Sequence, residues 1–289
     1  MHLIDVFNPL PEPQDRIALH FPFLPDTEGD PDFEPLRQVF LKHNVKMVER
    51  PLSEAVKLMD TAHISHVVMP AWKMRSVTTG RLVQDHTWQR VAQKIAQYPG
   101  RLRGWYSINP FDRMRGVREM KQVLTTQRGF VGAHFFATGF ERPLNHRDWY
   151  PFYAACEEVG KPIGMFVGWL PEIQPTSTVH PELLDDVACY FNDLVIVATH
   201  YVGPWEDSLM ALAHKHPNVY IATSGTPPRR WSEKFVHFID TWGRGKVMWG
   251  TTINVNWEES IGDLNKLPLK DESRELLYHG VAEKVFKLK

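Results

Sequence analysis

Eight short runs of β-branched and other apolar residues recur along the chain, and this repetition constrains the fold more than any other feature. The runs are apolar throughout rather than at every second position. That is typical of strands covered on both faces, as in a parallel sheet. The predicted strands are residues 3–7, 66–69, 102–108, 129–136, 162–167, 194–199, 219–223 and 246–250.

Amphipathic patterns with helical spacing fill the intervals between these runs. Eight strands with helical connections in a chain of 289 residues predict a single α/β domain, a (β/α)8 barrel spanning residues 1–289. An open doubly wound sheet is less consistent, because no GxGxxG segment follows an early strand. The predicted helices are residues 53–62, 86–98, 114–126, 149–159, 181–191, 205–215 and 230–242.

Two longer segments interrupt the repeat. Residues 10–38, rich in Pro and Asp, follow the first strand, and residues 169–181 follow the fifth. In a barrel both would emerge at the C-terminal ends of the strands, where barrel enzymes build their sites. They are candidate lids or partner-binding loops, or else loops without a specific role.

Charge and targeting features narrow the function classes. The chain has 33 Lys and Arg against 34 Asp and Glu, so no overall field attracts nucleic acid or an anionic membrane. No basic region leads into an apolar run at the N-terminus, and the longest apolar run, residues 163–170, is too short to span a membrane. Cys156 and Cys189 show no zinc-site spacing, and we expect both to be small buried side chains. These features predict a cytoplasmic protein.

Several segments carry a family resemblance. They are LIDVFNP (3–9), WYPFYAACEEVGKPIGMFVG (149–168), VIVATHYVGPWEDSLMALAHKHPNVYIATSG (195–225), GKVMWGTTIN (245–254) and LLYHGVAEKVFKL (276–288). In this order they resemble the amidohydrolase superfamily, in particular its aminocarboxymuconate-semialdehyde-decarboxylase-like branch. The resemblance implies a barrel of the metal-dependent hydrolase type, with its active site at the ends of the strands.

The same resemblance implies a divalent metal held by two histidines of strand one, one each of strands five and six, and an aspartate of strand eight. Only the strand-six histidine is kept, so we expect no metal centre of the family type. A metal that did bind would be a single Zn, Mn or Fe ion with His200 as its retained ligand. The positions that match the family ligands are Phe7, Pro9, Phe166, His200 and Thr252.

A second histidine is the main candidate for a substitute site. His134 ends strand four, and alternation along that strand directs it into the barrel mouth beside His200. With Asp5, lower in strand one, the two histidines could form an acid–base cluster or an improvised metal site. Alternatively, they hydrogen-bond within a packed mouth. The neighbouring phenyl rings would favour a neutral His200, and Ser224 reads as a turn residue.

Three tryptophans follow strands two, five and six: Trp72, Trp169 and Trp205. Near the mouth they could stack on a planar ligand. Equally, they could lie in the core or bury a subunit interface, where Trp is enriched.

The lost ligands lead to two functional hypotheses. In the first, the chain is a degenerate subunit that supports a catalytic amidohydrolase-like partner in a hydrolase, decarboxylase or hydroxylase complex, as a homo- or hetero-oligomer. In the second, it is a stand-alone hydrolase, lactonase or decarboxylase of a small carboxylated compound, with a rearranged or metal-free site around His134 and His200. A carboxylate substrate would require a cationic clamp. Candidates for that clamp are Lys73, Arg75 and Arg142.

Overall fold

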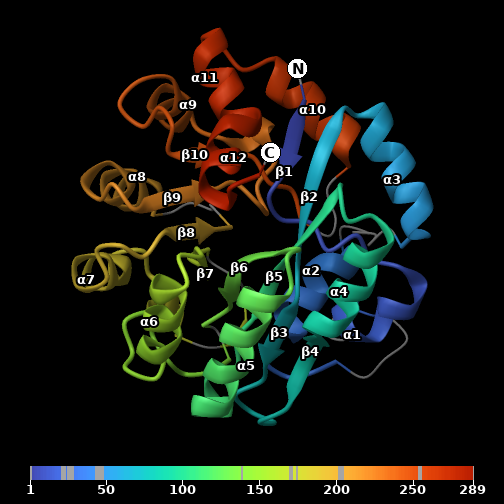
Figure 1. Cartoon of the computed structure of the whole chain (residues 1–289), viewed down its shortest axis with the longest axis vertical. Coiled ribbons are helices and arrows are strands. Elements are labelled where there is room, and N and C mark those ends of the chain that lie inside the picture. The colour runs from blue at the N-terminus through green and yellow to red at the C-terminus, as the bar shows by residue number, and fades with distance from the viewer. Residues whose placement is uncertain are drawn as a thin grey trace.

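The computed structural model describes residues 2–20, 24, 29–42, 49–137, 139–168, 172–173, 175–200, 205–252 and 256–288. Within them, eight parallel strands form one curled sheet in the order β1-β2-β5-β6-β7-β8-β9-β10, surrounded by helices (Figure 1). The strands are β1 (Leu3–Asp5), β2 (Ile64–Pro70), β5 (Leu102–Ser107), β6 (Phe130–Phe135), β7 (Ile163–Phe166), β8 (Ile196–Thr199), β9 (Val219–Ala222) and β10 (Val247–Met248).

The first and last strands of this sheet are joined just beyond their ends. The backbone N–H of Val6 donates to the carbonyl of Trp249 across 3.2 Å. Each of the eight predicted strands coincides with an observed one, and the (β/α)8 architecture is confirmed.

Helices cover the outside of the sheet, and each predicted helix overlaps an observed one. They pack through apolar faces, as Val91 and Ile95 of the fourth helix do. One further helix, α10, follows the last strand and was not predicted. The outer helices are α3 (Leu52–Thr61), α4 (Trp88–Gln97), α5 (Arg113–Thr126), α6 (Tyr150–Glu158), α7 (Leu183–Tyr190), α8 (Glu206–Lys215), α9 (Glu233–Asp240) and α10 (Trp257–Asn265).

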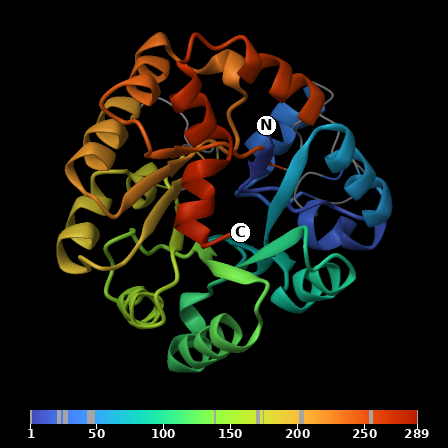
Figure 2. The ribbon, with the colours of Figure 1, turned by 45° about the horizontal axis from the view of Figure 1, so that its top comes forward.

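The C-terminal segment covers the N-terminal end of the barrel. It consists of α11 (Asp271–Glu275), a π-helical turn (Leu276–Gly280) and α12 (Val281–Phe286), which crosses the barrel opening in Figure 2. The ring of Phe286 packs edge-to-face on Trp105, with 5.1 Å between centroids. Because this end is closed by packing, a site inside the barrel has to open at the other end.

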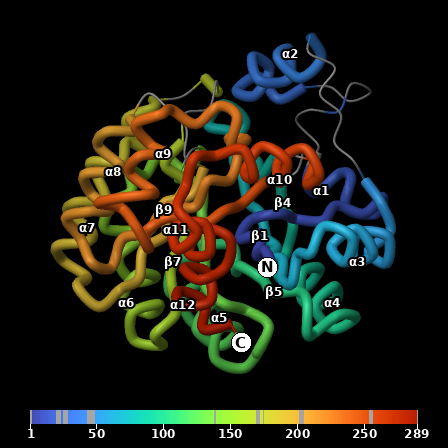
Figure 3. The backbone as a smooth tube through the Cα atoms, turned by 90° about the horizontal axis from the view of Figure 1, so that it is seen from above, coloured from blue at the N-terminus to red at the C-terminus, as the bar shows by residue number. Residues whose placement is uncertain are grey.

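The segment after β1 is folded rather than a plain loop. It contains a 3-10 turn (Pro13–Asp15), α1 (Arg16–His20) and α2 (Glu34–Lys42). An antiparallel hairpin, β3 (Trp72–Arg75) and β4 (Leu82–His86), follows β2 and was also not predicted. In Figure 3, α2 lies at the end of the molecule away from α12, and therefore on the side of the barrel mouth.

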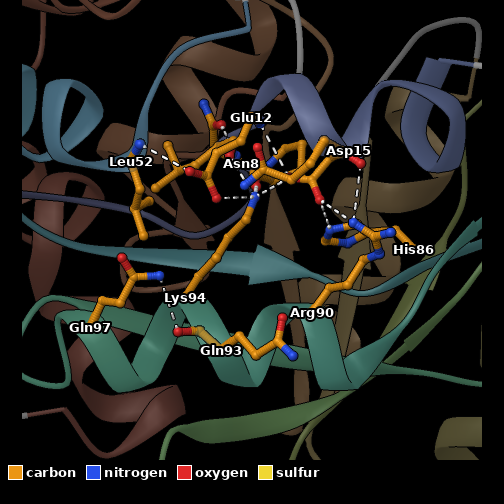
Figure 4. Close-up of polar contacts among 12 residues, drawn as sticks. Asn8, Glu12, Asp15, Leu52, His86, Arg90, Gln93, Lys94 and Gln97 are labelled. Atoms are coloured by element: carbon orange, nitrogen blue, oxygen red, sulfur yellow. Dashed lines mark hydrogen bonds and ion pairs between the residues drawn. The ribbon is translucent and has the colours of Figure 1, made fainter.

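A buried ionic network fixes the start of this segment (Figure 4). The ammonium of Lys94 lies 2.5 Å from the carboxylate of Asp15 and donates to the carbonyls of Pro9 and Leu10. His86 lies on the other side of the same carboxylate, at 3.5 Å. Burial disfavours the charged carboxylate, but the nearby imidazole of His86 and the charge of Lys94 outweigh it and lower the pKa of Asp15. The chain leaving β1 is thus tied to α4 and to the hairpin.

The two long segments that interrupt the predicted repeat contact each other. The side chain of Asp32 accepts hydrogen bonds from the hairpin turn, from Ser76, Val77 and Thr78. Its backbone carbonyl accepts from the amide of Ile173, in the segment after β7. The two segments and the hairpin therefore form one connected layer.

One prediction about the cysteines is wrong. Cys156 is buried as expected, but Cys189 is exposed because it lies on the outer side of α7. In the described part of the chain, no helix is both long and apolar enough to cross a membrane.

Candidate active site at the barrel mouth

Aromatic rings fill the space above the C-terminal ends of the strands. Phe7, which follows β1, lies 4.9 Å from His134 and 4.8 Å from His200 between ring centroids. Phe166, at the end of β7, lies 5.1 Å from His200. Phe136 contacts both imidazoles, at 5.0 and 5.5 Å. Both histidines therefore pack against the same two phenyl rings, Phe7 and Phe136.

His134 is fully buried on β6, and one of its ring nitrogens is engaged. Nε2 lies 2.8 Å from the hydroxyl of Thr199, whereas Nδ1 has no hydrogen-bond partner in the described residues. Gly164 on β7 makes room for the ring, since a Cβ there would lie 2.6 Å from the Cδ2 of His134. Burial, together with the nearby His200, holds the pKa of His134 well below its usual value, so the imidazole is neutral.

His200 follows β8 in a left-handed backbone conformation, with φ of +60°. Such a conformation is uncommon for a residue other than glycine and is often found at functional sites. Ser224 holds it there: the serine oxygen accepts from the backbone N–H of His200 at 3.1 Å and lies 3.4 Å from its Nδ1. Burial lowers the pKa of His200 to about 3, as its apolar surroundings predicted. Ser224 therefore positions the histidine rather than only forming a turn.

Asp5 does not join the two histidines. Its carboxylate accepts from the backbone amides of Phe7 and Thr251, and from the side chains of Asn8, Thr251 and Trp257. Burial raises its pKa, and these hydrogen bonds offset part of that effect. The described contacts of Asp5 thus join β1 to the segment after β10 and leave the acid–base cluster without its predicted carboxylate.

The three tryptophans have different positions. Trp72 stacks on Phe136 at 4.6 Å and lies edge-on to His200 at 6.1 Å, so it is part of the mouth, and its Nε1 is buried without a partner among the described atoms. Trp205 instead contacts His180, at 4.9 Å. Trp169 lies outside the described residues.

Among the described contacts, no candidate for the cationic clamp touches either histidine, but Arg75 and Arg142 converge over the ring of Phe111, at 5.0 and 5.6 Å. Lys73 is paired with Asp85 across the hairpin. Arg142 donates to Asp148 at 2.8 Å. Arg75 donates to the carbonyl of Gly139 and lies 5.0 Å over the ring of Phe111.

Glu172 is a candidate that the sequence did not reveal. It lies in the segment after β7 and is only 7% exposed, and neither carboxyl oxygen has a hydrogen-bond partner in the described structure. Burial raises its pKa to about 8, so the group is an uncharged acid at neutral pH. Its position in a Pro-rich loop gave no signal, because its burial depends on contacts between distant segments.

The donor set at the mouth does not fit a metal centre of the family type. Two imidazoles face mainly phenyl rings, and the nearest strand-one carboxylate, that of Asp5, is committed to five donors. In the described ranges, clusters of three or more potential ligands occur at two places away from the mouth: His2, His279 and Glu283, and Asp185, Cys189 and His216. The resemblance predicts that Phe7 and Phe166 stand at positions where family members have metal ligands, and this stays a prediction.

A cavity of about 680 Å³ lies between α3 and α10, on the outer side of the barrel. It reaches Asn8 and Trp257, which contact Asp5, but neither buried histidine lines it. The chemistry of the two imidazoles therefore belongs to the mouth and not to this cavity.

Several solved structures are similar to this chain over nearly its whole length. A TIM-barrel protein from Bordetella bronchiseptica is similar in structure, with a TM-score of 0.76, 20% identity, and coverage of 100% of this chain and 99% of that one. A dihydroxybenzoic acid decarboxylase from Polaromonas sp. JS666 with bound manganese is also similar, with a TM-score of 0.69 and 16% identity. This match covers 99% of this chain and 97% of that one. A probable 2-pyrone-4,6-dicarboxylic acid hydrolase from Acinetobacter baumannii is similar with a TM-score of 0.62 and 17% identity. This match covers 99% of this chain and 100% of that one.

At these identities the similar structures establish the fold alone. No curated protein sequence matches the chain. The family model for amidohydrolases, however, matches residues 44–288, which is most of the chain. The protein therefore belongs to the amidohydrolase family.

Proposed function

We propose that this chain is an enzyme that decarboxylates a small aromatic carboxylate at the barrel mouth, through His134 and His200 rather than through a metal centre of the family type. The observation that carries the proposal is the pair of neutral, buried imidazoles that pack against the same phenyl rings. Burying two titratable groups in an apolar site is costly for a fold that gains nothing from them.

The surroundings favour a planar substrate and the loss of its charge. Phe136 and Trp72 stack on each other at the mouth, so a substrate that enters there lies against aromatic rings. A carboxylate in this apolar site is poorly solvated, and breaking its bond to the ring disperses the charge into CO2. Because the substrate is an anion, one of the two neutral imidazoles takes up a proton from solvent as the substrate binds, and the two charges offset each other.

The proton then has a defined path. When the bond between the ring carbon and the carboxylate breaks, its electron pair stays on the ring carbon, which takes the proton from the imidazolium. CO2 leaves, and the histidine regains its proton from solvent in the next cycle. Thr199 and Ser224 each hold one nitrogen of a ring, which leaves the other nitrogen for this transfer.

Similarity to a decarboxylase and to a hydrolase supports the class of reaction. Hydrolysis of a lactone of a carboxylated compound is the second chemistry we propose for the pair, with a histidine as general base toward water. Neither reaction needs a carboxylate beside the imidazoles. This agrees with the position of Asp5, whose carboxylate accepts hydrogen bonds from Thr251 and Trp257 instead.

The supporting-subunit function stays a separate proposal. The observation that favours it is the complete burial of Phe7 and Phe166 at the mouth, where their rings occupy space that a substrate would need. In that case the chain would act only beside a catalytic amidohydrolase-like partner.

The test uses the full chain after treatment with a chelator. It is incubated with hydroxybenzoates and with pyrone carboxylates, and CO2 and products are measured. We expect turnover that the chelator leaves unchanged and that falls about 100-fold or more in His134→Ala and in His200→Ala. His237→Ala, on the exposed side of α9, is the matched control. Turnover that needs added metal, or that survives both substitutions, contradicts the proposal. Turnover only after a partner chain is added favours the subunit function.

A further inference from the structure

A second cluster of histidines lies at the opposite end of the barrel from the mouth. His2 immediately precedes β1, His279 lies in the π-helical turn, and Glu283 lies in α12. These elements meet at the N-terminal end of the barrel, where the start of the chain reaches the terminal helix (Figure 2). The chemistry proposed at the mouth does not use these residues.

Their ligand atoms converge on one small volume. The Nε2 of His2 lies 2.9 Å from the Oε1 of Glu283, and the Nδ1 of His279 lies 3.3 Å from the same oxygen. All three atoms are within 4.8 Å of one another. The contact from His279 is too poorly aligned to be a hydrogen bond, so its Nδ1 is buried without a hydrogen-bond partner among the described groups.

These distances match a metal-binding geometry. Zinc binds imidazole nitrogen at about 2.0–2.1 Å and carboxylate oxygen at about 2.0–2.2 Å in tetrahedral sites. Two neighbouring ligands are then roughly 3.4 Å apart, by tetrahedral geometry from the same bond lengths. The two imidazole rings are stacked with 23° between their planes, so the 44% exposed His2 ring has to turn before both nitrogen lone pairs point at one ion.

Local structure supports the arrangement. His279 and Glu283 are four residues apart, and the side chains meet across the junction of the π-helical turn and α12. Single π turns within helices are rare and often occur at functional sites. Two imidazoles with a carboxylate form a donor set that suits zinc and its neighbours in the first transition row.

The electrostatic surroundings permit a cation but limit its affinity. Arg101 and Arg103 lie near this face, where their charges reach His66, and they oppose a positive ion. The charge of Arg101 is offset by Asp60, at 2.6 Å. We therefore expect a site of moderate affinity.

We propose that His2, His279 and Glu283 form a binding site for a first-row divalent metal ion, with zinc as the expected occupant, that ties the first strand to the terminal helix. The ion would link residues 281 positions apart in the chain. Because such a link is made only in the folded state, the ion stabilises the fold.

Another cluster has to be separated from this one in any test. Asp185, Cys189 and His216 also converge, but the ammonium of Lys215 lies 2.6 Å from the same Asp185 oxygen that His216 contacts. A cation there would compete with an existing positive charge. We therefore assign no metal to that cluster and use it as a control.

The experiment uses the full chain without an affinity tag, stripped of metal and titrated with zinc chloride. Binding is followed by calorimetry and by the midpoint of thermal unfolding. We expect about one zinc ion per chain, and an increase in the midpoint of about 5 °C or more when free zinc is a hundredfold above Kd. His2→Ala and Glu283→Gln should weaken binding at least tenfold and reduce the increase to about half or less at the same free zinc concentration, while His237→Ala and Cys189→Ser leave both unchanged. The proposal is overturned if the wild type binds no zinc, or if His2→Ala and Glu283→Gln bind zinc as tightly as the wild type does. Loss of zinc binding in Cys189→Ser alone also overturns it.

Discussion

The carboxylate of Asp5 accepts hydrogen bonds from both the backbone amide and the hydroxyl of Thr251, across the seam between the first and last strands of the barrel. Trp257 adds a third donor from α10. In Asp5→Asn an NH2 group replaces one acceptor oxygen and faces these donors. We expect a loss of about 2–3 kcal/mol in the free energy of unfolding, measured with urea.

Asp207→Asn is the matched control for this prediction, because Asp207 pairs with Lys234 on the exposed surface. That change should alter stability by less than about 1 kcal/mol. An Asp5→Asn protein as stable as the wild type but without activity would show that Asp5 acts in the chemistry and not at the seam.

The second prediction concerns the contribution of Lys94 to the stability of the fold. Its ammonium is buried among Asp15 and the carbonyls of Pro9 and Leu10 (Figure 4). Lys94→Met leaves the Asp15 carboxylate buried without its main counter-charge, which should cost about 3–5 kcal/mol of unfolding free energy. Lys234→Met, in an exposed pair, provides the comparison and should cost less than about 1 kcal/mol. Equal effects of the two substitutions would contradict a structural role for the buried network.

The strands could be predicted from the sequence because each is a continuous apolar run between turn signals. The hairpin of β3 and β4 was missed although Trp72–Arg75 alternate between apolar and charged residues, and its turn depends on the distant side chain of Asp32. The same holds for the segment after β1, whose position depends on the contact between Asp15 and Lys94. Contacts of this kind have no local sequence signal.

The candidate site divides in the same way. His134 and His200 could be placed at the mouth because strand alternation and strand ends fix their direction. The partner of Asp5 could not be predicted, since Thr251 is distant in sequence and the seam forms only when the barrel closes. Ser224 and Glu172 were missed for a related reason: each acquires its role from a neighbour contributed by another segment.

Glu172 predicts a dependence of stability on pH. Its pKa is raised from 4.5 to about 8 by burial. Between these values the folded chain keeps a proton that the unfolded chain releases, so unfolding free energy falls as pH rises from about 4.5 to about 8 and then levels off. Glu172→Gln removes this contribution, because the amide does not titrate. We expect the unfolding midpoint of the wild type to fall relative to that of Glu172→Gln across this range.

The comparison is made by urea denaturation at intervals between pH 4.5 and 9. Glu182→Gln, a change of a mostly exposed carboxylate, serves as the control. Parallel curves for the wild type and Glu172→Gln would mean that the Glu172 carboxyl has its ordinary pKa and is solvated.

The phenyl rings at the mouth give the last prediction. The rings of Phe7 and Phe166 lie 4.8 and 5.1 Å from that of His200, so Phe7→His together with Phe166→His would bring three imidazoles to one place. Three imidazoles suffice for a zinc site with one open position. We expect this double variant, made together with His2→Ala to remove the proposed site at the other end, to retain about one zinc ion per chain after dialysis. The same protein with leucine at both positions should retain none, because leucine has no donor atom. Equal metal content in the two proteins would mean that Phe7 and Phe166 do not stand where the relatives hold their metal. The proposed metal-free site at the mouth would then not be a replacement of the family's metal centre.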